Sequence, residues 1–122
     1  MAQEPSLDPI QRINPGKRLS DAVVHGSTIY LAGQVASDPG ADIKGQARDI
    51  LAQIDRLLGS LGSSKQRLLS ATIYLADMAD FAAMNEVWDG WAPRGNLPAR
   101  ATVEAKLAKA EYRIEIQAIA AK

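Results

Sequence analysis

Two polar residues in the last quarter of the chain, Arg100 and Gln117, could bind and act on a small organic acid. A guanidinium presents a planar fork of N–H donors that matches a carboxylate. A primary amide both donates and accepts hydrogen bonds, so it can orient a water molecule or a polar ligand group. The two side chains together predict an anion site with a polar companion. The competing interpretation is that Arg100 belongs to a surface or interface ion pair, which is the commoner place for an arginine in a strand.

An alternation of polar and apolar residues predicts two strands that pair as a hairpin and bring these side chains together. Odd positions are apolar in residues 99–107, and even positions are apolar in residues 111–121. A two-residue turn at residues 108–109 sets complementary charges opposite each other, whereas a slide by two residues creates repulsive pairs. The predicted cross-strand pairs are Lys106 with Glu111, Glu104 with Arg113, Thr102 with Glu115, and Arg100 with Gln117.

Strand and helix signals precede this hairpin. Residues 22–35 favour strands with a tight turn at 25–27, and Leu68–Leu75 is a short apolar run with β-branched residues. Apolar residues from Ile43 to Leu58 recur at spacings of three and four, which predicts a helix. Asp42 can cap its start, and Gly62 lies just past its end.

A second helix is expected from Asp77 or Asp80 up to Pro93, with Phe81, Trp88 and Trp91 on one stripe. The resulting order is β-β-α-β-α-β-β, which predicts an α+β fold with both helices on one face of a mixed sheet. The polar side chains of the hairpin would occupy the other face. Apolar side chains of other strands would also be exposed there, so subunit association through this face is expected.

Length and composition fit one domain with an ordinary core. The chain has 122 residues, of which 47% are hydrophobic. We expect a single domain over residues 18–122, preceded by an irregular lead-in over residues 1–17, which holds three prolines. Trp88 and Trp91 are expected to pack in the core rather than to stack on a ligand.

Charge and composition exclude several function classes. Basic and acidic residues are equal at 14 each, so no excess charge points to nucleic acid or to a membrane surface. The absence of cysteine excludes a disulfide framework and a thiol nucleophile, and His25 is the single histidine. No apolar run approaches the roughly 20 residues of a membrane span. Residues 1–10 lack the pattern of a secretory signal, so we expect a cytoplasmic protein.

Several motifs resemble the RidA/YjgF family of small imine and enamine deaminases. The family signature has the form P-A-R-x-x-V-E followed by I-E-I-E-A-I-A. Here it is matched by residues 97–104, which read LPARATVE, and by residues 114–120, which read IEIQAIA. Shorter matches are residues 32–34 (AGQ) and residues 80–85 (DFAAMN). The resemblance extends from about Arg18 to the C-terminus.

The resemblance implies a chorismate-mutase-like α+β fold and a homotrimer with a cleft between neighbouring subunits. It also implies hydrolysis of reactive 2-imino acids, formed from enamines, to 2-keto acids and ammonia. Arg100 occupies the position of the family arginine that binds the substrate carboxylate. No metal or organic cofactor is implied. The implied partner is a small carboxylate-bearing substrate, with no role for nucleic acid or a membrane.

The chain departs from the family pattern at several positions. By the motif match at residues 114–120, the water-activating glutamate of the family corresponds to Gln117 in this chain. A neutral amide cannot act as a general base near pH 7. The N-terminal loop carries Leu19 where active members often have a tyrosine, and Thr102 replaces a common cysteine. The other site positions that the resemblance implies are Gly33, Gln34 and Asn85. Gly33 would let another group approach the backbone, and Asn85 is expected to make a structural hydrogen bond.

Two functions remain open from the sequence. One is a deaminase in which Arg100 holds the substrate carboxylate and Gln117 orients the attacking water. The other is a binding module that holds a carboxylate metabolite without turnover, and Gln117 is the residue that favours it.

Overall fold

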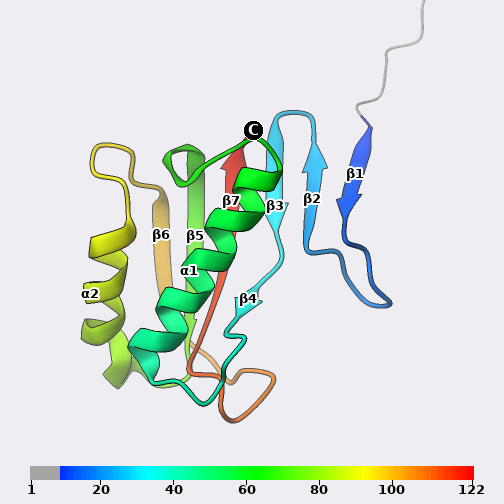
Figure 1. The fold of residues 1–122 in the computed structure, drawn as a ribbon. Helices are drawn as coiled ribbons and strands as arrows, with labels where there is room; N and C mark the ends of the chain where they lie inside the picture. The colour runs from blue at the N-terminus through cyan, green and yellow to red at the C-terminus, as the bar shows by residue number, and fades with distance from the viewer. Residues whose placement is uncertain (1–8) are drawn as a thin grey trace, which may run out of the picture.

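The computed structural model describes residues 9–122, in which one mixed sheet carries two α-helices on the same face (Figure 1). The helices of this part are α1 (Ile43–Ser60) and α2 (Phe81–Trp91), with short 3-10 turns η1 (Lys65–Arg67) and η2 (Met78–Asp80). The strands are β1 (Ile10–Ile13), β2 (Ala22–His25), β3 (Thr28–Leu31), β4 (Gln34–Val35), β5 (Leu68–Leu75), β6 (Ala99–Glu104) and β7 (Ile114–Ala121).

The sheet has the order β1-β2-β3-β7-β5-β6, with β4 paired to β7. Figure 1 shows the strands in this order, with α1 and α2 lying across one side. The expected α+β fold, with both helices on one face of a mixed sheet, is therefore confirmed. In residues 9–122 the order differs from the predicted one in containing two additional short strands, β1 and β4.

The apolar stripe of α1 forms the centre of the core. The helix begins where predicted, because the Asp42 carboxylate accepts a hydrogen bond from the backbone N–H of Gly45 at 2.8 Å. Gly62 follows the helix with a φ of 77°, a conformation that glycine adopts without strain. The stripe faces alternate residues of β5 and β7. The fully buried residues of this core include Ile50, Ile54 and Leu58 from α1 and Ile73, Leu75, Ile114 and Ile116 from the two strands.

The predicted hairpin between the last two strands is wrong. β6 pairs in parallel with one edge of β5, whereas β7 pairs antiparallel with the other edge of β5 and with β3. Arg100 and Gln117 are therefore not cross-strand neighbours. Alternation defines which side chains share a face, and facing charges contribute only about 0.2–1 kcal/mol per pair, too little to choose the neighbouring strand.

β6 also presents its residues to the faces opposite to those expected. Arg100 pairs with Ala71, which is 3% exposed under the helices, so the Arg100 side chain lies on the helix side. The apolar set of β6 faces the open side, where Val103 is 41% exposed. β7 follows the prediction, with Ile114 and Ile116 buried in the core.

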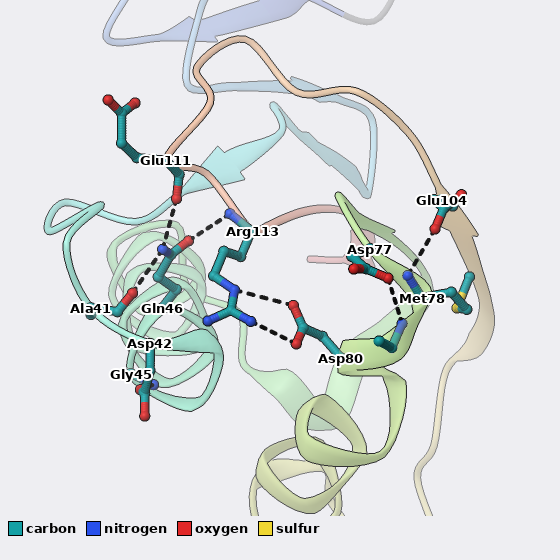
Figure 2. Close-up of polar contacts among 11 residues, drawn as sticks. Ala41, Asp42, Gly45, Gln46, Asp77, Met78, Asp80, Glu104, Glu111 and Arg113 are labelled. Atoms are coloured by element: carbon teal, nitrogen blue, oxygen red, sulfur yellow. Dashed lines mark hydrogen bonds and ion pairs between the residues drawn. The ribbon is translucent and has the colours of Figure 1, made fainter.

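Charged residues of the expected hairpin have other partners (Figure 2). Arg113 forms a two-pronged ion pair with Asp80, in which Nη2 lies 2.8 Å and Nε lies 3.2 Å from the carboxylate oxygens. The Glu104 carboxylate accepts a hydrogen bond from the backbone N–H of Met78 at 2.9 Å. These contacts tie the ends of β6 and β7 to the start of α2.

Gln46 joins α1 to the segment before β7 (Figure 2). Its side chain is fully buried. The amide nitrogen donates to three backbone carbonyls, and the amide oxygen accepts from the backbone N–H of Arg113 at 2.9 Å. The three accepting carbonyls belong to Pro39, Ala41 and Glu111.

β1 lies inside the segment that was expected to be irregular. Its residues pair antiparallel with β2, so the prediction of an irregular lead-in is wrong for Ile10–Ile13. Three of these four residues are exposed, which explains the absence of a clear pattern in the sequence. The rest of the lead-in up to residue 8 lies outside the described residues. No helix among residues 9–122 is long and apolar enough to cross a membrane.

Replacing Gln46 by leucine is expected to lower the free energy of unfolding by about 2–4 kcal/mol. The change leaves the N–H of Arg113 and three carbonyls without their partner, and a buried unpaired polar group costs about 1–3 kcal/mol. Urea denaturation measures the loss. The control is Arg48→Leu on an exposed position of the same helix, which should change stability by less than about 0.5 kcal/mol. Equal stability of both variants would contradict the role of Gln46.

Candidate functional site

Arg100 lies on the edge strand β6, where its guanidinium rests on an aromatic ring of α2. The Cζ atom is 5.2 Å from the centroid of the Trp88 ring. Trp88 is 7% exposed, so it belongs to the core as predicted while also covering one face of the arginine. A cation over an indole ring is favourable by about 0.5–2 kcal/mol.

The hydrogen-bonding edges of Arg100 have no protein partner among residues 9–122. The ion pairs in that part of the chain are Lys44 with Glu86 and Arg113 with Asp80. Arg100 thus keeps its planar N–H donors for another group. Of the two forms of the competing interpretation, a surface ion pair is not found among residues 9–122, and an interface ion pair would involve a second copy of the chain.

Thr102 lies beside Arg100 on the same side of β6, two residues along the strand. Its hydroxyl is buried and has no hydrogen-bond partner in the described part of the chain. An unpaired buried hydroxyl is costly and therefore uncommon in folded proteins. Arg100 and Thr102 therefore form one polar patch, which the predicted register would also have placed on a common face.

Gln117 and Glu115 lie on the opposite face of the sheet. They stand across from Thr72 and Tyr74 of β5, whose neighbours in sequence, Ala71 and Ile73, point into the core. Gln117 is exposed on this open face.

The Glu115 side chain is half-buried and lies against the backbone of Gly33. A Cβ atom at Gly33 would collide with Oε2 of Glu115, so the carboxylate occupies the space that a side chain at position 33 would need. The group that approaches the Gly33 backbone is therefore a carboxylate of β7.

Glu115 is a candidate that the sequence reasoning missed as a site residue. It lies two positions before Gln117 on the same strand, so alternation puts both side chains on one face. The predicted hairpin register had instead assigned Glu115 as a partner of Thr102. The signal that could have found it is the pairing of a carboxylate on this face with the glycine of the AGQ motif.

The other predicted site residues lie at separate places. Leu19 is 63% exposed in the loop between β1 and β2, beside a hollow of about 370 Å³. The Gln34 side chain donates to the carbonyl of Ala32 at 3.0 Å and closes the turn before β4. Asn85 is half-buried on α2, one helical turn before Trp88, and so lies on the side of Arg100.

A single copy of the chain does not unite all these groups. Arg100 and Thr102 lie on the helix side of the sheet, and Glu115 and Gln117 lie on the open side. The intervening layer is the sheet itself, so one small ligand cannot touch both patches within one chain.

A cavity of about 500 Å³ lies elsewhere, between α1 and α2. Its lining includes neither patch of predicted site residues. Lys44 binds Glu86 across it, and that hydrogen bond and charge lower the pKa of the Glu86 carboxyl. Asp55 accepts a hydrogen bond from the indole N–H of Trp91 at 2.9 Å in the same groove.

The family model described as "Endoribonuclease L-PSP" matches residues 9–122 of this chain. The RutC family protein YoaB of Escherichia coli K12 is 46% identical over 112 residues, which cover 92% of this chain and 97% of that protein. The 2-iminobutanoate/2-iminopropanoate deaminase of Rattus norvegicus is 34% identical, over 83% of this chain and 77% of that protein.

Solved structures of similar proteins have the same fold. The YjgF family member NMB1025 of Neisseria meningitidis superposes with a TM-score of 0.93 at 45% identity, covering 96% of this chain and 98% of that one. A protein of unknown function from Pseudomonas aeruginosa superposes with a TM-score of 0.91 at 45% identity, covering 93% and 99%. The chain belongs to the RidA/YjgF family. The matching family model, "Endoribonuclease L-PSP", covers the same family under another name.

Replacing Gly33 by alanine is expected to push the Glu115 carboxylate away from the backbone without disrupting the fold. The conflict is with the far end of a flexible side chain, and φ at Gly33 is not positive, so the free energy of unfolding should fall by less than about 1 kcal/mol. A crystal structure of the variant would show the displaced carboxylate.

Gly59→Ala is the matched control, because a Cβ there meets open space on α1. This variant should gain about 0.5–1 kcal/mol of stability, since alanine favours a helix over glycine. An unmoved Glu115 carboxylate in Gly33→Ala would contradict the account of the close approach.

Proposed function

We propose that this protein hydrolyses small 2-imino acids to 2-keto acids and ammonia. The observation that carries the proposal is the patch on β6, where neither the Arg100 guanidinium nor the Thr102 hydroxyl has a hydrogen-bond partner among residues 9–122. The rat relative, which is named as a 2-iminobutanoate/2-iminopropanoate deaminase, supports the same chemistry.

The patch can hold the carboxylate of such a substrate. Two parallel N–H groups of Arg100 donate to its two oxygens. This fixes the neighbouring C=N carbon in position. Water adds to the protonated imine carbon, and the carbinolamine that forms expels ammonia as the C–N bond breaks, leaving the keto group.

Glu115 supplies what Gln117 lacks. A carboxylate can accept the proton of the attacking water, whereas a neutral amide can only orient it. Since both side chains lie on the open face of β7, we assign the proton-accepting role to Glu115 and the orienting role to Gln117.

The two patches must meet between copies of the chain. Arg100 and Glu115 lie on opposite faces of the sheet, so a substrate that touches both lies against two subunits. Exposed apolar side chains on the strands, among them Ile10, Tyr30 and Val103, favour association through the sheet. The homotrimer implied by the family resemblance is the assembly we propose.

Replacing Arg100 by glutamine should lower kcat/KM about 100-fold, because a desolvated arginine–carboxylate contact contributes a few kcal/mol. The assay follows 2-keto acid release from freshly generated 2-iminobutanoate, corrected for spontaneous hydrolysis. Arg56→Gln, an exposed arginine of α1, is the control and should match the wild type. An unchanged rate for Arg100→Gln would overturn the proposal.

Glu115→Gln should lower kcat about 100-fold, since general-base catalysis contributes about 100- to 10,000-fold. Gln117→Glu is the matched variant and should stay within about threefold of the wild type, because position 117 is not the one that accepts the proton. A large gain in Gln117→Glu, without a loss in Glu115→Gln, would move the base to position 117.

Mixing the two inactive variants tests the shared site. When Arg100→Gln and Glu115→Gln subunits are unfolded together and refolded at equal amounts, about a quarter of the interfaces combine an intact arginine with an intact glutamate. About a quarter of the wild-type activity should return. A mixture that stays inactive, although mass measurement shows mixed oligomers, would contradict the site between copies.

The second candidate is a non-catalytic protein that binds a carboxylate metabolite, and the neutral amide of Gln117 favours it. Saturable binding of 2-oxobutanoate to the wild type, without any rate above spontaneous imine hydrolysis, would select this function.

A further inference from the structure

We propose that Trp88 is a positioning residue that holds the Arg100 guanidinium in the plane required to grip a carboxylate. The inference rests on the proposed function, because it assumes that Arg100 binds the substrate. Trp88 lies outside the family signature at residues 97–104 and 114–120.

The Arg100 guanidinium lies over the Trp88 ring, and its N–H groups have no partner among residues 9–122. Cζ of Arg100 lies 5.2 Å from the centroid of the Trp88 ring. The five N–H donors of an arginine lie in the plane of the group, so stacking on a ring does not consume them.

Arg113 of the same chain shows another way to hold a guanidinium, which is an ion pair with a carboxylate. Nε and Nη2 of Arg113 both donate to the carboxylate of Asp80. That arrangement immobilises the group but occupies its fork, so Arg113 has a structural role. Stacking on Trp88 restrains Arg100 and keeps the fork available for a ligand.

The Trp88 ring is itself held in place. It is 7% exposed, and its centroid lies 5.4 Å from that of Trp91 at an interplanar angle of 52°. The Trp91 indole in turn donates to the Asp55 carboxylate on α1 at 2.9 Å. The position of the ring over which Arg100 lies is therefore set by both helices.

A restrained arginine lowers the entropy lost on binding. A free arginine side chain loses substantial rotamer entropy when a ligand orders it, and here folding has already ordered it. The gain applies equally to the substrate and to the transition state, because both carry the same carboxylate. Loss of the ring should therefore raise KM and leave kcat unchanged.

The experiment compares Trp88→Leu with Trp88→Phe. Trp88→Leu should raise KM for 2-iminobutanoate and Kd for 2-oxobutanoate about tenfold, with kcat within about twofold of the wild type. Trp88→Phe retains an aromatic face and should stay within about threefold in both constants. Met84→Val, another buried position of α2, controls for loss of stability and should leave KM and Kd unchanged.

Coupling to Arg100 separates positioning from a general packing effect. Trp88→Leu should cause no further rise in Kd when it is added to Arg100→Gln, because the group that the ring positions is already absent. Equal rises in both backgrounds would overturn the inference. The inference would also be overturned if Trp88→Leu unfolds cooperatively and binds 2-oxobutanoate with the same Kd as the wild type.

A measurement on the wild type covers the case in which Trp88→Leu does not fold. The Nε–H proton of Arg100 should resonate upfield of the other arginine Nε–H protons because of the indole ring current, and should shift on addition of 2-oxobutanoate. An unshifted resonance in the free protein would overturn the stacking. If 2-oxobutanoate binds the wild type and Arg100→Gln equally, the proposed function itself fails.

Discussion

The parallel pairing of β5 with β6 is the constraint on which the candidate site depends. Parallel neighbours need a crossover, and α2 supplies it between these strands. The register sets Arg100 across from Ala71, on the face that the helices cover. The arginine is thereby brought beneath Trp88 of the same crossover, in place of the antiparallel hairpin in which it would have faced Gln117.

The polar side chains near this crossover divide into two groups. Gln46, Asp80 and Arg113 satisfy one another and nearby backbone groups, and they join α1 and the start of α2 to the segment before β7. Arg100 and Thr102 remain without partners among residues 9–122, although both lie close to the core. Unpaired polar groups so close to a core are exceptions among buried polar atoms, and they support the proposed binding of an external group. The sheet separates this patch from Glu115, which is why the proposed chemistry requires a second copy of the chain.

The candidate site could be predicted in part. The residue types and the family motifs single out Arg100, Thr102 and Gly33, because the P-A-R and AGQ motifs are short segments that can be recognised without the fold. Glu115 was missed because its importance depends on contact with Gly33, more than 80 positions away in the chain. Trp88 was correctly assigned to the core, but its second contact, with Arg100, follows from how β6 is placed beside α2.

By itself the sequence determined the helices, most of the strands and which residues alternate along each strand, since these follow from local periodicity and capping. The bounds of β5 and the cap at Asp42 agree with the structure for this reason. Only the tertiary structure decided which strands are neighbours and which face of β6 meets the helices. The physical reason is that alternation is symmetric between the two faces and two edges of a strand. The choice depends on burial of β5 and β7 against α1 and on the crossover through α2, which no short segment encodes.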